Sequence, residues 1–190
     1  MELTIKAGVL SALTNLSGKK DIRYYLNGVM IEAHENRLRL VATDGHVMGI
    51  YQDEIESNDS FRIVIPNDII SKLDKKKNNF LMQDGDVWRI DNISFYPVEG
   101  QYPDYMRVLP KEPLTKEMAQ FNPDFITRFH KVAKGFGFKA GLLGITHNGQ
   151  NAALVDIGMP LNFVGIMMPM RSEMGMASVP AWLNHFKEIA

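Results

Sequence analysis

An internal repeat with a period of roughly 55–60 residues limits what this chain can fold into more than any other feature. Three stretches superimpose when Ile5, Ile65 and Phe121 are aligned: IKAGVLSAL, IPNDIISKL and FNPDFITRF. In each stretch, apolar residues recur at the spacing of one face of a helix. The chain therefore carries one small supersecondary unit three times.

Each unit is predicted to begin with a short strand and a helix. The strands are expected at residues 3–6, 61–65 and 118–121, and the helices at 7–16, 66–73 and 122–132. Gly18 is expected to end the first helix, while Pro66 and Asn67 are residue types that begin helices. All three units thus predict the same order of elements.

Short strands are predicted after each helix. In the first unit, residues 21–48 contain two half-buried strands, the first including Tyr25 and Leu26, separated by a polar break at residues 34–36. Asp44 and Gly45 suit the turn that follows, since Asp caps its own backbone and Gly accepts a positive φ. The later strands are expected at 79–82, 87–90, 93–96, 142–146, 152–157 and 163–168. The prediction is an α+β fold of three βαβββ units, with antiparallel sheets on one side and helices on the other.

Two segments lie outside the repeat. Residues 109–116 contain two prolines without alternation and indicate a connector between domains. Residues 180–189 place Trp182, Leu183, Phe186 and Ile189 on one side of a predicted amphipathic helix. The predicted division is a complete domain at 1–108, a connector at 109–116, a half domain at 117–171 and a tail at 172–190.

Composition narrows the class of protein. The 190 residues, 45% hydrophobic and 23% charged, are typical of a soluble globular protein, and no apolar run is long enough to span a bilayer. The amino terminus does not resemble a signal peptide, and the absence of cysteine excludes disulfides and thiolate metal sites, so a cytoplasmic location is expected. The five histidines lack metal-ligand spacing, and neither a Ser-His-Asp arrangement nor a glycine-rich phosphate loop is present. No catalysis, cofactor or metal is predicted.

Basic residues gather at or beyond the carboxyl end of each predicted helix. Because the formal net charge is −1, any affinity for nucleic acid must come from such local clusters. A single cluster would be explained by solubility and by the favourable interaction of cations with the carboxyl end of the helix dipole. Three clusters at equivalent positions instead indicate a surface that contacts phosphates. Tyr24 and Tyr25 could add base or sugar contacts. The predicted DNA-facing residues are Lys19, Lys20, Arg23, Tyr24, Tyr25, Lys72, Lys75, Lys76, Lys77, Arg128, Lys131 and Lys134, and Lys139 extends the third cluster.

Four stretches resemble the bacterial DNA polymerase III beta subunit family, the sliding clamps. They are RYYLNG at 23–28, VATDGH at 41–46, YPDYMRVLP at 102–110 and MPMR at 168–171. Their order and spacing match the family's second domain, and the resemblance resumes at FNPDF in the second half of the third domain. The family's first domain and the first half of its third domain have no counterpart here.

The resemblance implies a DNA clamp fold whose rings enclose duplex DNA, with helices lining the hole and sheets outside. It also implies a hydrophobic cleft that takes short peptides from polymerases, the clamp loader and repair proteins. Methionines suit such a site because they adapt to varied apolar side chains. Without the resemblance, the same methionines would be interpreted as part of the hydrophobic core. The implied cleft residues are Leu26, Thr43, Gly45, His46, Pro103, Arg107, Val108, Asn122, Phe125, Ile166, Met168, Pro169, Met170 and Arg171.

The chain departs from the family in two places. Val47 and Met48 follow His46 where the family usually has an arginine, and the chain continues after Arg171, where the family ends. The tail could cover exposed surface, form a subunit contact or, through residues 182–186, occupy a cleft.

Two functions remain open at this stage. The first is a DNA-encircling processivity factor that forms a homo-oligomer, either an isologous dimer or a tetrameric ring of twelve units. The second is a clamp-like adaptor or decoy that keeps the cleft but does not encircle DNA. The short chain suggests a phage or plasmid origin for the latter.

Overall fold

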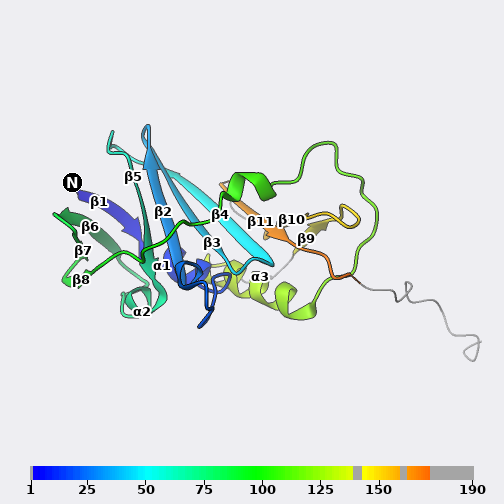
Figure 1. The fold of residues 1–190 in the computed structure, drawn as a ribbon, viewed down its shortest axis with the longest axis horizontal. Helices are drawn as coiled ribbons and strands as arrows, with labels where there is room; N and C mark the ends of the chain where they lie inside the picture. The colour runs from blue at the N-terminus through cyan, green and yellow to red at the C-terminus, as the bar shows by residue number, and fades with distance from the viewer. Residues whose placement is uncertain (1, 139–142, 159–161, 172–190) are drawn as a thin grey trace, which may run out of the picture.

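The computed structural model describes residues 2–138, 143–158 and 162–171 (Figure 1). The first unit comprises β1 (Glu2–Lys6), α1 (Ala7–Leu13), the 3-10 helix η1 (Tyr24–Leu26), β2 (Gly28–His34), β3 (Arg37–Thr43) and β4 (Val47–Glu54). The second comprises β5 (Phe61–Pro66), α2 (Asn67–Ile70), β6 (Asn78–Asp84), β7 (Val87–Ile90) and β8 (Ile93–Phe95), followed by the 3-10 helix η2 (Tyr105–Val108). The third comprises α3 (Pro123–Gly135), β9 (Gly144–Thr146), β10 (Ala153–Asp156) and β11 (Phe163–Met167).

The first two units exchange their leading strands. The four-stranded sheet has the order β1-β6-β7-β8, and the seven-stranded sheet has the order β5-β2-β3-β4-β11-β10-β9. β1 pairs antiparallel with β6 of the second unit, and β5 pairs antiparallel with β2 of the first. Each unit therefore completes the sheet of the other, which interlocks them.

The third unit joins the first through an antiparallel pair of β4 and β11, so that one sheet runs across both. Gly49 and Gly165 lie opposite each other in this pair. A Cβ atom at Gly49 would lie 2.5 Å from Leu16 Cδ1, and one at Gly165 would lie 2.5 Å from Phe129 Cε1. Glycine at both positions therefore allows side chains from the α1 and α3 regions to pack directly on the sheet.

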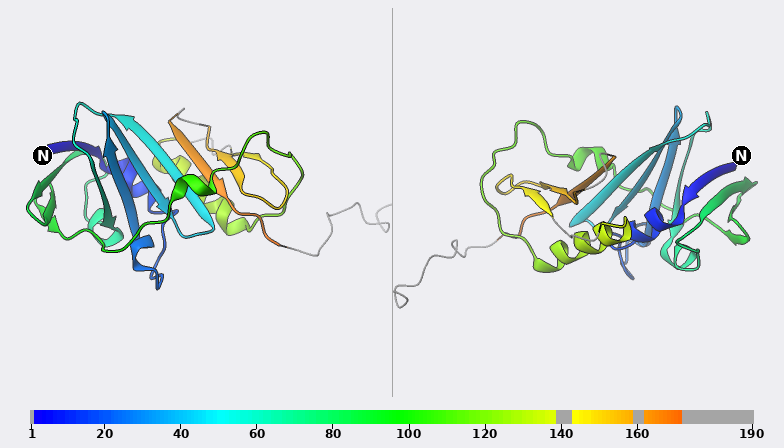
Figure 2. Two further views of the ribbon diagram at one scale, coloured as in Figure 1. Left: turned by 45° about the horizontal axis from the view of Figure 1, so that its top comes forward. Right: turned by 180° about the vertical axis from the view of Figure 1, so that it is seen from behind.

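The helices lie on one side of the sheets, as Figure 2 shows from behind. The main core fills the space between them and includes Leu10, Leu13, Ile31, Leu40 and Phe129. This arrangement confirms the predicted α+β fold with helices on one side. It arises because alternate residues of each strand face the helices.

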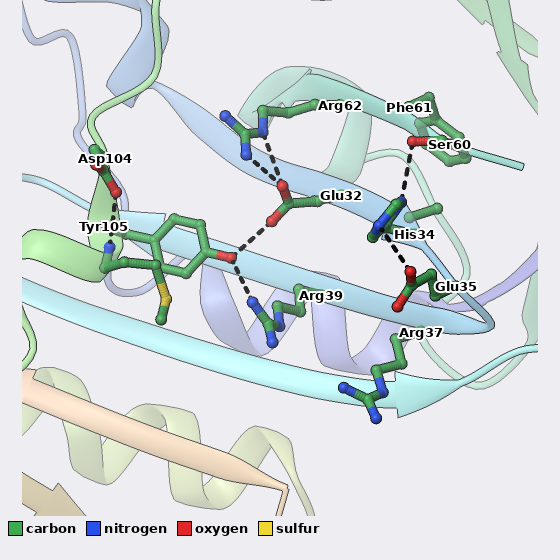
Figure 3. A pocket seen from close by; sticks show the side chains of 12 residues that line it. Glu32, His34, Glu35, Arg37, Arg39, Ser60, Phe61, Arg62, Asp104 and Tyr105 are labelled. Atoms are coloured by element: carbon green, nitrogen blue, oxygen red, sulfur yellow. Dashed lines mark hydrogen bonds and ion pairs between the residues drawn. The ribbon is translucent and has the colours of Figure 1, made fainter.

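A second core lies on the outer face of the seven-stranded sheet. Met30, Val41 and Val64 face outward there and are covered by Tyr102 and Tyr105 from the segment after β8. The Tyr102 hydroxyl donates a hydrogen bond to the Val41 carbonyl at 3.1 Å, and burial raises the pKa of Tyr102. The same face is charged toward the β2–β3 hairpin, where Tyr105 contacts Glu32 and Arg39 (Figure 3).

Several predicted boundaries are wrong. Residues 118–121 form no strand, because the exchange seen in the first two units needs a second unit that the described chain does not supply to the third. The residues around this segment form hydrogen bonds with the β9–β10 loop instead. Ala119 N donates to His147 Nδ1 at 2.9 Å, and Gly149 N donates to the Glu117 carbonyl at 2.9 Å.

The first helix is also shorter than predicted. It ends at Leu13, and Gly18 lacks a positive φ and donates its N–H to the Leu26 carbonyl at 2.8 Å instead of forming a helix cap. Tyr25 and Leu26 belong to η1 and not to the strand. Three predicted features lie outside the described residues: Lys139, the tail at 172–190, and residue 142, which begins the predicted strand at 142–146. No helix in the described ranges is long and apolar enough to cross a membrane.

Candidate functional site

An apolar hollow of about 100 Å³ opens on the outer side of the sheet, between the β3–β4 turn, η1, η2 and the end of β11. Its residues come from the first unit, the third unit and the segment that follows β8. They are Arg23, Tyr25, Leu26, Thr43, Gly45, His46, Val47, Met48, Pro103, Asp104, Tyr105, Val108, Ile166 and Met168. We call this hollow the cleft.

The β3–β4 turn forms one wall of the cleft and is held by its own side chains. The Thr43 hydroxyl donates to the Val47 carbonyl at 2.7 Å and accepts from Gly45 N at 3.0 Å. Asp44 Oδ1 accepts from the backbone N–H groups of His46 at 2.8 Å and Val47 at 3.0 Å. Gly45 has a φ of 93°, which other residues adopt only with strain. The predicted role of Asp44 and Gly45 in the turn is confirmed.

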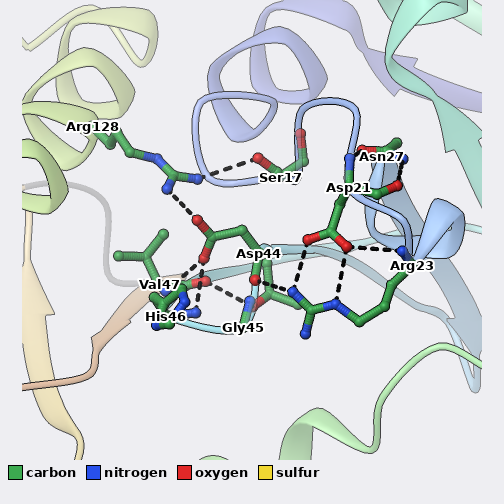
Figure 4. A network of polar contacts seen from close by, with 10 residues as sticks. Ser17, Asp21, Arg23, Asn27, Asp44, Gly45, His46, Val47 and Arg128 are labelled. Carbon is green, nitrogen blue, oxygen red and sulfur yellow. Dashed lines mark hydrogen bonds and ion pairs between the residues drawn. The ribbon is translucent and has the colours of Figure 1, made fainter.

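Arg128 of α3 ties this turn to the end of α1 (Figure 4). Its Nη1 forms an ion pair with Asp44 Oδ2, its Nε donates to the Asn15 carbonyl at 2.6 Å, and its Nη2 donates to the Ser17 carbonyl at 3.2 Å. The two charged side chains are only 22% and 18% exposed. The guanidinium group of Arg128 is thus hydrogen-bonded to other groups of the protein and does not project freely from the helix face.

The environment of Asp44 favours its charged form. Burial alone would raise the pKa of Asp44, but hydrogen bonds from Arg128 and from the backbone of His46 and Val47 outweigh burial and lower it. The imidazole of His46 stacks on the Phe125 ring of α3, with centroids 5.7 Å apart and planes inclined by 18°. The turn and α3 therefore meet through both a charged and an aromatic contact.

Arg23 is also held within the protein. Its guanidinium binds Asp21 at 2.7 and 3.0 Å and donates to the Asp44 carbonyl at 2.9 Å (Figure 4). The hydrogen bond from Arg23 lowers the pKa of Asp21 to about 2. Arg23 was predicted to face DNA, but the structure places it at the rim of the cleft.

Eight of the predicted cleft residues line the hollow: Leu26, Thr43, Gly45, His46, Pro103, Val108, Ile166 and Met168. The other six are not among the lining residues. Asn122 caps α3 by accepting from Asp124 N at 2.9 Å, Phe125 supports His46, and Arg107 pairs with Asp104 at 3.0 Å. Pro169, Met170 and Arg171 follow β11, and the Met170 side chain is exposed.

Six lining residues were not assigned to the cleft from the sequence: Arg23, Tyr25, Val47, Met48, Asp104 and Tyr105. Arg23 and Tyr25 belong to the RYYLNG stretch and Asp104 and Tyr105 to YPDYMRVLP, so the motifs themselves were the signal. Tyr24, predicted to face DNA, is exposed and lies against the edge of the Tyr25 ring.

Lysines from two of the three basic clusters meet on the helix side. A hollow of about 590 Å³ between α1 and α2 brings together Lys19, Lys20 and Lys75. The hollow is also lined by Ser11, Thr14, Asn27, Asn67, Asp68, Ile70 and Ser71. Lys72 and Lys77 form exposed pairs with Asp68 and Asp74, and Lys76, Lys131 and Lys134 are exposed. Among the described residues, no group of three His, Cys, Asp or Glu side chains could hold a metal ion.

Repeated units with interlocked antiparallel sheets and helices on one side define this protein as a DNA clamp fold. A family model described as "DNA polymerase III beta subunit, central domain" matches residues 9–104. The chain belongs to this family.

Individual relatives agree with the family match. The chain is 36% identical over 105 residues to the beta sliding clamp of Buchnera aphidicola subsp. Rhopalosiphum padi, covering 50% of this chain and 29% of the relative. It is 29% identical over 150 residues to the beta sliding clamp of Vibrio cholerae, covering 74% of this chain and 39% of the relative. The chain thus spans well under half the length of these two relatives.

Solved structures show the same fold. The DNA polymerase III subunit beta from Pseudomonas aeruginosa superimposes with a TM-score of 0.68 at 18% identity, covering 90% of this chain and 66% of the other. A putative beta subunit from Eubacterium rectale gives a TM-score of 0.66 at 13% identity, covering 90% and 65%.

Proposed function

We propose that the protein is a sliding-clamp-like DNA replication accessory protein that binds partner peptides in the cleft and contacts duplex DNA with its helix side. The observation that carries the proposal is the meeting of eight predicted residues from the first unit, the third unit and the segment after β8 in one apolar hollow. Rigid walls of glycine and proline beside adaptable methionines suit short apolar peptides. Polymerase and clamp-loader peptides are the proposed partners, and the role is non-catalytic.

Met168→Glu is expected to weaken peptide binding at least about tenfold, because it places a carboxylate where an apolar side chain would be buried. The measurement is fluorescence anisotropy with a labelled pentapeptide that contains two leucines and a carboxyl-terminal phenylalanine. Met118→Glu is the matched control, since Met118 is exposed and lies outside the cleft. Equal affinity of both variants would show that the peptide binds elsewhere.

The helix side supports sequence-independent binding of duplex DNA. Lys19, Lys20 and Lys75 share a hollow with hydroxyl and amide side chains, which are groups that bind phosphates. The one carboxylate among the described lining residues, Asp68, lies 3.9 Å from Lys72 Nζ. Because Arg23 and Arg128 are held by carboxylates and carbonyls, the lysines are left as the main proposed phosphate contacts. The DNA contact is therefore expected to depend strongly on salt.

The double variant Lys19→Gln, Lys75→Gln is expected to weaken binding to a short duplex. The slope of the logarithm of the binding constant against the logarithm of the salt concentration should become shallower by about 0.9 for each phosphate contact that is lost. Titration at several salt concentrations measures both quantities. Arg89→Gln with Lys111→Gln removes the same charge from exposed positions outside this hollow and should change little. If both double variants lose affinity equally, the helix side has no special role.

We also propose that the protein encircles duplex DNA as an oligomer. Three units per chain close a twelve-unit ring as a tetramer, and the third unit can pair isologously with its copy in a dimer. Size-exclusion chromatography with light scattering distinguishes these states from a monomer. Retention on nicked circular DNA and release after linearisation would support a ring.

A non-encircling adaptor or decoy is the second candidate. The observation behind it is that the cleft is formed within a single chain, so peptide binding does not itself require a ring. This function predicts a monomer or dimer that binds the apolar peptide without topological retention on circular DNA. In either case we propose a complete clamp domain at 1–108, a connector at 109–116, a half domain at 117–171 and a cytoplasmic location.

A further inference from the structure

A second hollow, of about 570 Å³, lies on the outer face of the sheet at the β2–β3 hairpin (Figure 3). We call it the hairpin hollow. It is lined by Glu32, Ala33, His34, Glu35, Arg37, Arg39, Ser60, Phe61, Arg62, Asp104, Tyr105 and Met106. Asp104 and Tyr105 also line the cleft, so the two hollows are neighbours that share η2 and the residue before it.

The carboxylates of the hairpin hollow all have partners. Glu32 forms an ion pair with Arg62 and accepts from the Tyr105 hydroxyl at 2.6 Å. Burial would raise the pKa of Glu32, but these two hydrogen bonds outweigh it and lower the pKa. Glu35 lies 3.5 Å from His34 Nε2, and Asp104 lies 3.0 Å from Arg107 Nε. The Glu32 and Asp104 carboxylates are therefore each paired with an arginine, whereas Glu35 is largely exposed beside His34.

Two arginines of the hollow are not committed in this way. Arg37 and Arg39 lie two residues apart on β3, which places them on the same face of the sheet. Arg39 donates to the Gln52 side chain at 2.9 Å and to the Tyr105 hydroxyl at 3.1 Å, both uncharged acceptors. Arg37 has Glu54 opposite it in the strand register, yet in the described ranges its guanidinium group forms neither a hydrogen bond nor an ion pair. In the described ranges neither guanidinium group forms a direct ion pair with a carboxylate, although Glu32, which already pairs with Arg62, lies opposite Arg39 in the strand register.

We propose that the hairpin hollow binds an acidic segment flanking the apolar motif of a partner peptide held in the cleft. This inference rests on the proposed function of the cleft. Charge complementarity supports it, because a guanidinium group matches a carboxylate with two parallel hydrogen bonds. The shared η2 region supports it as well, since a peptide that leaves the cleft past Tyr105 reaches Arg39 next. Met106, which is exposed beside the hollow, offers an apolar contact to the stems of such side chains.

The test compares four extended versions of the leucine- and phenylalanine-containing pentapeptide. Three glutamates or three glutamines are added at either the amino or the carboxyl end, and affinities for the full chain are measured by anisotropy at low and high salt. One glutamate version is expected to bind about threefold to tenfold more tightly than its glutamine counterpart, the gain that two partly exposed ion pairs provide. High salt should remove the gain.

Arg37→Gln should abolish most of this gain and leave the affinity for the unextended pentapeptide unchanged, since Arg37 does not line the cleft. Arg89→Gln, an exposed arginine on another sheet, should retain the gain. The proposal is overturned if no glutamate version gains affinity or if Arg37→Gln keeps the gain. It is also overturned if Arg37→Gln weakens duplex DNA binding and not the peptides, which would make the hollow a phosphate site. Failure of the unextended pentapeptide to bind would overturn the cleft as well, so the two failures are distinguishable.

Discussion

Arg128→Ala is expected to lower the free energy of unfolding by about 2–3 kcal/mol, because it leaves Asp44 Oδ2 without its ion pair and two backbone carbonyls without this donor. It should also weaken binding of the apolar pentapeptide, since the turn that carries Gly45 and His46 loses its support. The same variant should change duplex DNA affinity little. Urea unfolding, anisotropy and DNA titration measure the three effects.

A double-mutant cycle isolates the ion pair. Asp44→Asn and Arg128→Met, made singly and together, should show a coupling energy of about 1–2 kcal/mol, as expected for contacting residues in one network. Arg89→Met is the matched control, and this exposed arginine should cost less than about 0.5 kcal/mol. A large loss of DNA binding in Arg128→Ala with unchanged peptide affinity would instead restore Arg128 to the DNA face.

The Asp44–Arg128 ion pair should also make the stability of the folded protein depend on pH. Because the pKa of Asp44 is lower in the folded protein, its contribution to stability is present above the unfolded pKa of about 4 and is lost as the pH falls through the folded value. The difference in stability between the wild type and Asp44→Asn should therefore shrink in acid.

Gly165→Ala is the second substitution expected to have a large effect. Its Cβ would meet Phe129 Cε1 at 2.5 Å and both Val155 Cβ and the Val155 carbonyl oxygen at 3.0 Å. The carbonyl cannot move without disturbing the β10–β11 pair. We expect a loss of about 2–3 kcal/mol in the free energy of unfolding by denaturant, the upper part of the range for overpacked cores.

Gly144→Ala is the matched control, because its nearest neighbours are 3.5 and 3.9 Å away and it also lies in a strand of the third unit. It should change stability by less than about 0.5 kcal/mol. Equal tolerance of both substitutions would contradict the close approach of α3 to the β4–β11 junction.

The sequence predicted the repeat, the side of the sheet that the helices cover and much of the cleft, because these depend on local periodicity and on motifs. It did not predict the contacts of Arg128, since the spacing of basic residues does not reveal that Asp44 and the carbonyls of Asn15 and Ser17 lie within reach. It also predicted a strand at residues 118–121, because an apolar pattern does not show whether a neighbouring strand is there to pair with. Both errors concern contacts between residues far apart in the chain.

The exchange of leading strands also bears on how the chain is made. Glu2 pairs with Met82 and Lys6 with Asn78, so β1 leaves the ribosome well before β6, its hydrogen-bonding partner. Until then the alternating pattern of β1, with Leu3 and Ile5 pointing inward, has no sheet to join. Nascent chains that end before β6 should consequently remain open to chaperones and proteases.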